Sequence, residues 1–127
     1  CVALLTTQHV GRLIVGGHDV EIVPINYVAG AEVITFRTEP GGSLDRAGGR
    51  AVVFEVDMFD ERTRSGWSVI VRGNLHPVAA GDEPTLQTWA PGDRTRWMTV
   101  TVDEVTGRLL RGAVETDPDR RRGAGYL

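Results

Sequence analysis

Residues 32–49 of the sequence read "EVITFRTEPGGSLDRAGG" and place a strand, a glycine loop and a helix start in succession. The alternation over 32–38 has the period of two that is typical of a half-buried β-strand. Pro40 and the two glycines after it end this strand, because proline cannot donate to a ladder and glycine favours turns. Ser43 is suited to cap a short helix that runs to Ala47. The stretch therefore predicts a strand that ends beside a loop rich in backbone N–H groups.

The end of this strand and the following loop carry groups that suit a phosphate. Arg37 is a fixed cation, Thr38 offers a hydroxyl, and the glycines allow backbone N–H groups to approach closely. Ser43 would begin a helix whose first N–H groups favour anions. Each residue also has an ordinary interpretation, with Arg37 as a solvated surface residue and Ser43 as a helix cap alone. The residues by themselves leave both interpretations open.

On either side of this stretch, strand patterns dominate the chain. Segments rich in β-branched and aromatic residues predict six antiparallel strands. Their expected ranges are 11–15, 21–28, 32–38, 50–59, 66–79 and 96–102, the last resuming over 106–110 after a turn at Asp103 and Glu104. Short helices are expected over 1–7, 43–47 and 82–88. Because closure removes unpaired strand edges, this order favours a mainly β, six-stranded antiparallel barrel.

Length and composition indicate one globular domain. The 127 residues are 41% hydrophobic and 24% charged, and no run of about 18 apolar residues could span a bilayer. We expect the barrel domain to cover residues 1–116. The charged, glycine-rich segment 117–127 has little to bury and is expected to be an exposed or disordered tail.

The charge and cysteine content narrow the range of partners. Seventeen acidic and 14 basic residues give a net charge of −3, which disfavours nucleic acid. Every basic residue is arginine, so each fixed cation is a planar fork of donors. Cys1 is the single cysteine and excludes an internal disulfide, which favours a cytoplasmic location. The sequence begins in mid-pattern at Cys1 without an initiator Met, so we expect a preceding segment.

Two further stretches are candidate walls of a binding site. Pro24, followed by Ile25 and Asn26, interrupts a strong strand pattern, which indicates a strand edge against which a flat ligand could lie. Trp67 and Ser68 open a later strand and could place an aromatic face and a hydroxyl at the barrel mouth. The ordinary interpretations are a protective edge proline and a core tryptophan. For the other two tryptophans, Trp89 and Trp97, the core is favoured, although either could pack across a subunit contact.

The sequence predicts no catalytic side chain and no metal site. His9, His18 and His76 are scattered and fit neither a nucleophilic triad nor metal-ligand spacing. Glu55 and Asp57 share one face of an expected strand, but hydrogen-bonding or surface roles explain them more simply.

In order along the chain, several motifs resemble one family. They are "GRLIV", "VPINYV", "VITFRTEPGGSL", "VVFEVDMFDERTRSGWSVIVRG" and "WMTVTVDEVTGRLL". Together they cover almost the whole chain and are similar to the pyridoxamine 5′-phosphate oxidase-like, FMN-binding split barrels, in particular the branch that contains nitroimidazole-resistance proteins.

This resemblance implies a homodimer of six-stranded split barrels with one FMN in each of two interface clefts. It matches the positions of nine residues to cofactor contacts. The residues at the phosphate-holding positions are Arg37, Thr38, Ser43 and, through its backbone, Leu44. The residues that run along the flavin ring are Pro24, Ile25 and Asn26, and the residues of a second wall are Trp67 and Ser68. Trp97 would reach the flavin of the neighbouring subunit.

The resemblance also implies an activity, and the sequence departs from the family at two positions. Members commonly carry lysine where this chain has Ser43, and nitroimidazole-resistance members tend to carry histidine where it has Arg37. From the resemblance as a whole we expect an FMN-dependent oxidoreductase that passes a hydride between the flavin and a small organic substrate. The alternatives are a flavin carrier or sensor without turnover, a reductase that binds the deazaflavin F420, a haem-binding barrel, or an empty interaction domain.

Overall fold

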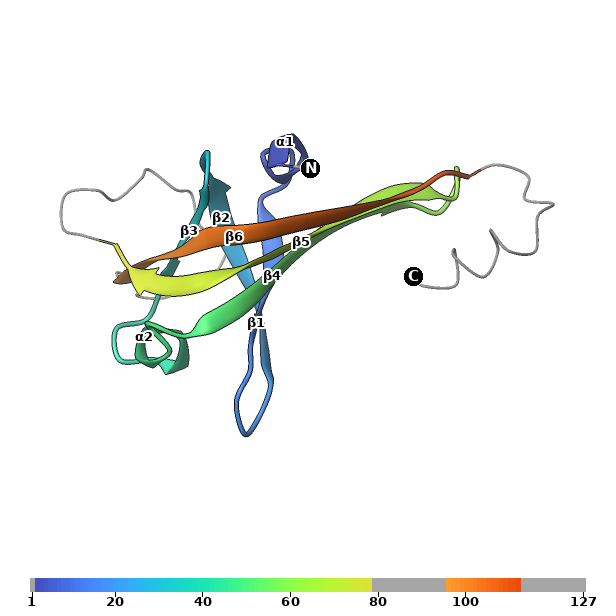
Figure 1. Cartoon of the computed structure of the whole chain (residues 1–127). Coiled ribbons are helices and arrows are strands. Elements are labelled where there is room, and N and C mark those ends of the chain that lie inside the picture. The colour runs from blue at the N-terminus through green and yellow to red at the C-terminus, as the bar shows by residue number, and fades with distance from the viewer. Residues whose placement is uncertain (1, 79–95, 113–127) are drawn as a thin grey trace.

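The computed structural model describes residues 2–78 and 96–112. In chain order its elements are α1 (Val2–Leu5), β1 (Val10–Val15), β2 (Glu21–Ala29), β3 (Val33–Thr38), α2 (Ser43–Arg46), β4 (Ala51–Asp60), β5 (Ser65–Pro77) and β6 (Arg96–Leu110). The strands close into one antiparallel barrel in the order β1-β2-β3-β6-β5-β4 (Figure 1). The mainly β barrel expected from the sequence is confirmed. The helix expected over 82–88, Trp89 and the tail over 117–127 lie outside the described residues.

The barrel interior follows directly from the strand alternation. Along β3, Ile34 and Phe36 are fully buried, whereas the residues between them are only half-buried. On the facing strands, the ring of Tyr27 meets the ring of Phe54 edge to face, with centroids 5.0 Å apart. These side chains belong to a single apolar cluster that all six strands line. The cluster therefore fixes which side of every strand faces outward.

The strands differ in how far they extend along their neighbours. The register joins β4 to β5 from Ala51–Asn74 to Asp60–Ser65, and these two strands continue with β6 well beyond the shorter strands (Figure 1). By contrast, β1 joins β4 only over Arg12–Val15, and β2 joins β3 only over Tyr27–Ala29. The two short seams therefore leave parts of β1, β2 and β4 free of strand partners on one side within the described chain.

The turn expected at Asp103 and Glu104 is wrong, because β6 runs unbroken past both residues. The register pairs Arg72 with Glu104 but Gly73 with Val102, so Asp103 is an extra residue that forms a bulge. Asn74 Nδ2 donates to Asp103 Oδ2 over 3.0 Å and holds this irregular point. Because the bulge allows the charged residues Asp103 and Glu104 to lie inside a long strand, their sequence pattern resembled that of a turn.

The first helix packs against the barrel through Leu5 and is shorter than expected, with β1 beginning at Val10. The Tyr27 hydroxyl donates to the Leu5 carbonyl over 2.5 Å, and Leu5 is buried. Burial raises the pKa of Tyr27 to about 12. Both described helices have four residues, far too few for either to cross a bilayer.

Candidate functional site

The structure divides eight of the nine predicted cofactor residues into an inward and an outward group, and leaves Ser43 exposed at the start of α2. The inward group has four members. Ile25, Leu44 and Trp67 belong to the apolar cluster, and Thr38 follows the inward alternation of β3 at 9% exposure. Pro24, Asn26, Arg37 and Ser68 occupy the alternate positions of their strands, which face outward. The candidate site is therefore on the outer face of the barrel, where the second group can present side chains.

Arg37 is the most informative residue of this outer face. It pairs with Trp97 in the β3–β6 register, and its guanidinium carbon lies 5.4 Å from the centre of the Trp97 ring. Its Nε is buried and has no hydrogen-bond partner among the described residues. A buried N–H without a partner is costly, so it indicates an acceptor that the described chain does not itself supply. An anion fits this requirement.

Pro24 lies where the sequence placed a strand edge. In β2, residues from Glu21 to Asn26 pair with β1, but the pairing with β3 begins only at Tyr27. The Tyr27 N–H bonds to the His9 carbonyl, and the ladder alternates, so the nitrogen of Pro24 faces away from β1. The open side of β2 thus lacks one N–H donor at Pro24, which is exposed, and this confirms the edge interpretation.

The register also brings Asn26 toward Arg37. Tyr27 pairs with Phe36, so the next position of the same ladder would place Asn26 opposite Arg37. Both are outward residues of their strands, and Pro24, two residues before Asn26, lies on the same face of β2. Ile25, between them, is 4% exposed and packs inside the barrel, so only its backbone can meet a ligand. The residues predicted for the flavin ring on β2 and the Arg37 predicted for the phosphate on β3 thus lie on one surface of two adjacent strands.

The side chain of Asp45, which the sequence assigned to the short helix, holds the loop between β3 and α2. Asp45 Oδ2 accepts from the Gly41 N–H over 2.7 Å, and Arg96 Nε donates to Asp45 Oδ1 over 3.0 Å. The hydrogen bond from Gly41, followed by Arg96, lowers the pKa of Asp45. Arg96 also pairs with Thr38 in the register. Gly41 has φ 73°, a left-handed conformation that favours glycine. The loop beside Thr38 is therefore fixed in shape.

The expectation that Ser43 caps α2 is wrong. Gly42 occupies the cap position, no side chain caps the helix, and Ser43 is its first residue. The exposed Ser43 hydroxyl instead donates to Glu21 Oε1 over 2.8 Å, which joins the loop to the β1–β2 hairpin. Leu44 is 5% exposed and packs in the core, so only its backbone is available. Ser43 can meet an anion only by exchanging its carboxylate partner.

The expected second wall is divided between two faces. Trp67 is 7% exposed and joins the apolar cluster, which favours the core interpretation that the sequence left open. Ser68 is equally buried but is an outward position, with Asp57 on one side and Arg108 on the other in the register. Only Ser68 therefore presents its side chain to the outer face.

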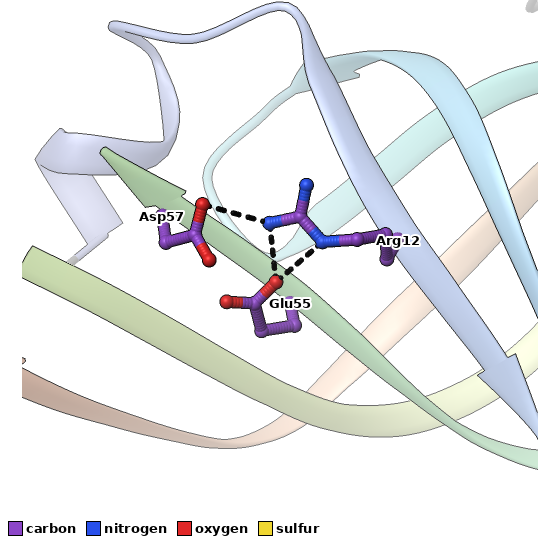
Figure 2. Close-up of polar contacts among 3 residues, drawn as sticks. All are labelled: Arg12, Glu55 and Asp57. Atoms are coloured by element: carbon purple, nitrogen blue, oxygen red, sulfur yellow. Dashed lines mark hydrogen bonds and ion pairs between the residues drawn. The ribbon is translucent and has the colours of Figure 1, made fainter. Parts of the chain in front are cut away.

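Between these walls lies an ion cluster of Arg12, Glu55 and Asp57, drawn in Figure 2. Arg12 Nε donates to Glu55 Oε1 over 2.7 Å, its Nη2 contacts the same oxygen, and Nη2 also lies 3.0 Å from Asp57 Oδ1. The three side chains are 35%, 21% and 35% exposed. Burial, followed by a hydrogen bond with Asp57, raises the pKa of Glu55. One guanidinium thus faces two carboxyl groups. Arg12 and Glu55 are 43 residues apart in the sequence, so the strand pattern alone could not reveal their contact.

The arrangement suits a ligand with an anionic end and a flat body. Arg37 supplies a partly buried cation with an unmet donor, and the unpaired side of β2 at Pro24 leaves room for the flat body to lie against the strand. The described residues contain no group of three or more acidic, histidine or cysteine side chains able to hold a metal ion. Binding and orientation of an organic anion are the chemistry that this face can supply.

Comparison with known proteins agrees with this description. The model of a family described as pyridoxamine 5′-phosphate oxidase matches residues 1–109. Among solved structures, the FAD binding protein from Mycobacterium smegmatis is 33% identical, with 87% of this chain and 93% of that chain covered and a TM-score of 0.76.

More distant structures share the fold. A candidate pyridoxamine 5′-phosphate oxidase from Corynebacterium glutamicum is 25% identical over 87% of this chain and 86% of that one, with a TM-score of 0.71. A candidate 5-nitroimidazole antibiotic resistance protein from Bacteroides thetaiotaomicron is 14% identical over 85% and 81%, with a TM-score of 0.65, and shows the fold alone. A search of the curated proteins finds no match.

Proposed function

Because the chain belongs to the pyridoxamine 5′-phosphate oxidase family, we propose that it binds a flavin nucleotide on the outer face of its barrel. The observation that carries this proposal is the buried Arg37 Nε that has no acceptor among the described residues. The 33% identical relative, described as an FAD binding protein, supports a flavin over other organic anions.

In this proposal Arg37 holds the phosphate, and the Trp97 ring fixes the guanidinium from one side. Thr38, Ser43 and the Leu44 backbone complete the phosphate end, since the loop before them is held by Asp45 and Arg96. Thr38 is nearly enclosed and Ser43 is engaged with Glu21, so both contribute less than Arg37. FMN is the flavin that we propose first.

We propose that the flavin ring lies along β2. Pro24 and Asn26 offer an outward surface on a strand edge, Ile25 offers backbone groups, and Ser68 offers a hydroxyl. Trp67 supports this surface from the interior. We propose that a second copy of the chain covers the same face, since a flavin ring needs a second apolar side to leave water. Trp97 of one subunit would then approach the flavin of the other.

The reaction that suits such a site is hydride transfer between the flavin and a small organic molecule. The bound flavin supplies the redox chemistry, and the protein binds it, orients it and limits the access of water. The second candidate function is a flavin carrier or sensor without turnover. The hydrogen bond between Ser43 and Glu21 favours it, because a carboxylate beside the phosphate end weakens binding and would make the flavin exchangeable.

A titration followed by reduction tests these proposals. The purified protein is mixed with FMN, FAD, riboflavin, F420 and haem in turn, and binding is followed by absorbance and by sedimentation. Saturable binding of a phosphorylated flavin by a dimer supports the site, and bleaching of its absorbance on addition of NADH or NADPH supports the oxidoreductase. A bound flavin that stays oxidised with either donor supports the carrier. Failure of every flavin to bind excludes the proposed function.

A further inference from the structure

The phosphate end proposed above has one assigned cation, Arg37, and two carboxylates beside its loop. Glu21 accepts from the Ser43 hydroxyl, and Asp45 accepts from the Gly41 N–H. A phosphate monoester carries a charge of about −1.5 to −2 at neutral pH, so both carboxylates would repel it. One guanidinium does not offset these charges, and tight binding of the anion needs a second cation beside the loop.

The strand register brings Arg96 to this end of the barrel. Arg96 is paired with Thr38, and the neighbouring pair of the same ladder joins Arg37 to Trp97. Strand alternation places Arg37 on the outer face and Arg96 on the side of Thr38. Because Thr38 and Arg96 form the last pair of the ladder, the Arg96 side chain is not enclosed and is 49% exposed. The two arginines therefore flank the end of β3, where the loop begins, from its two sides.

Asp45 fixes the direction of the Arg96 side chain. Asp45 Oδ1 accepts from Arg96 Nε over 3.0 Å, while Asp45 Oδ2 accepts from the Gly41 N–H over 2.7 Å. One carboxylate, only 18% exposed, thus joins the guanidinium to the loop. Because this contact uses Nε alone, the two terminal nitrogens of Arg96 keep their N–H donors, and no residue of the described chain accepts from them.

Arg46 is the other arginine close to the loop in the sequence, and it has no comparable support. It is the exposed last residue of α2, and its side chain has no hydrogen bond or ion pair within the described chain. Its side chain would lose rotational freedom on binding an anion, whereas Arg96 has already lost much of that freedom in its contact with Asp45. Pre-organisation therefore favours Arg96.

We propose that Arg96 is a second ligand of the phosphate and that Asp45 is the positioning residue that aims its guanidinium. This inference rests on the proposed flavin site. Arg96 Nε offsets the charge of Asp45, and the terminal nitrogens of Arg96 donate to phosphate oxygens that Arg37 leaves unmet. Hydrogen bonds between ionised groups are shorter and stronger than those between neutral groups. The pair of arginines thereby selects a phosphorylated flavin over riboflavin.

The first test compares a flavin that carries a phosphate with one that lacks it. Arg96→Met is expected to weaken the binding of FMN about tenfold or more, the effect of losing a hydrogen bond to a charged group, and to leave the binding of riboflavin unchanged. Arg46→Met removes an exposed arginine from the adjacent helix and is the matched control, which should change neither affinity. Unchanged FMN binding by Arg96→Met, or equal weakening of both flavins, overturns the proposal.

The second test decides what the carboxylate of Asp45 does. Asp45→Asn releases Arg96 from its fixed direction, so FMN binding is expected to weaken, by less than in Arg96→Met. In the Arg96→Met background the same change is expected to strengthen FMN binding, because it then removes only a repulsive charge. Asp19→Asn removes one exposed carboxylate from the β1–β2 hairpin and is the control for net charge. Stronger FMN binding by Asp45→Asn in both backgrounds overturns the positioning role.

The third test needs no flavin and so separates this proposal from the proposed function. Inorganic phosphate is titrated into the flavin-free protein, and the ¹⁵N NMR signals of the arginine Nε–H groups are followed. Saturable shifts of the Arg37 and Arg96 signals are expected, with the Arg46 signal unchanged. A titration that moves Arg37 alone, or neither of the two, overturns the proposal. Shifts of both signals in a protein that binds no flavin would support the phosphate contact and exclude the flavin function.

Discussion

Phe54 and Glu55 are neighbours on β4 and lie in opposite environments. Phe54 is fully buried against Tyr27 in the apolar cluster, whereas Glu55 is partly exposed outside and shares the guanidinium of Arg12 with Asp57. Inside the barrel, stability depends on filled volume. Outside it, polar groups are half-buried and incompletely matched, with two carboxyl groups around one guanidinium at Arg12 and an unmet donor at Arg37. The comparison indicates that the interior makes the fold, and the unmatched polar groups are why we assign the proposed site to the outer face.

The strongest way to test this division is to remove interior volume. Phe54→Ala is expected to reduce the free energy of unfolding by about 3–5 kcal/mol, because it loses burial and leaves a cavity beside Tyr27. Val53→Ala, on the outward side of the same strand, is the matched control and should cost about 1 kcal/mol or less. Urea unfolding measures both. Similar losses for the two variants would contradict the separation of the faces.

The next variant should affect binding and spare the fold. Arg37→Met is expected to weaken the binding of a phosphorylated flavin by about 1.5–3 kcal/mol, the range of a hydrogen bond to a charged group. The free energy of unfolding should change by no more than about 1 kcal/mol, since the contact with Trp97 is all that the described fold loses.

Two controls isolate the phosphate contact of Arg37. Riboflavin lacks the phosphate, so its affinity should be the same for Arg37→Met and the unchanged protein in a fluorescence titration. Arg62→Met removes an arginine from the exposed β4–β5 turn and should change neither affinity. Equal weakening of riboflavin and FMN would place the effect of Arg37 on the ring or on folding, and would exclude it as the phosphate ligand.

A smaller effect is expected where the outer face contributes to stability. Arg12→Met leaves Glu55 and Asp57 without their cation and should reduce the free energy of unfolding at neutral pH by about 1–2 kcal/mol. Burial already raises the pKa of Glu55 above its unfolded value, and loss of the Arg12 hydrogen bond raises that pKa further. A carboxyl with a raised pKa destabilises the fold as pH rises, so the loss should shrink when Glu55 becomes protonated in acid.

Urea unfolding at neutral and mildly acidic pH measures this dependence. Arg72→Met is the control, since Arg72 is an outward, exposed residue of β5 for which the described chain provides no ion pair. A loss for Arg12→Met that is the same at both pH values would show that the side chain acts through packing of its methylene groups and not through its charge.

The sequence predicted the interior well and the outer face only in part. Strand alternation assigned Ile34 and Phe36 to one face of β3 and Arg37 to the other, because side chains alternate with a fixed period. The same pattern cannot show which distant strand supplies a partner. The contacts from Arg12 to Glu55 and from Ser43 to Glu21 depend on strand order around the closed barrel. The bulge at Asp103 was hidden for the same reason, since it depends on register with β5.

Tyr27 is an exception to the division between an apolar interior and a polar outer face, because its hydroxyl is a polar group inside the barrel. Its hydroxyl donates to the Leu5 carbonyl and so joins α1 to the barrel. Tyr27→Phe is expected to reduce the free energy of unfolding at neutral pH by about 1 kcal/mol, the ordinary net value of one hydrogen bond. Such a loss would show that the interior accepts a polar group only when that group is paired.

The alkaline limb of the stability curve gives an independent check on Tyr27. Burial raises its pKa from 10.0 to about 12, so the folded protein favours the neutral phenol. Between these values the unfolded chain loses this proton first, and the stability that Tyr27 contributes decreases as pH rises from about 10 toward 12. Tyr27→Phe lacks this decrease, so the two stability curves should converge in that window. Parallel curves would mean that Tyr27 ionises equally in both states, and that the interior is open to water at this residue.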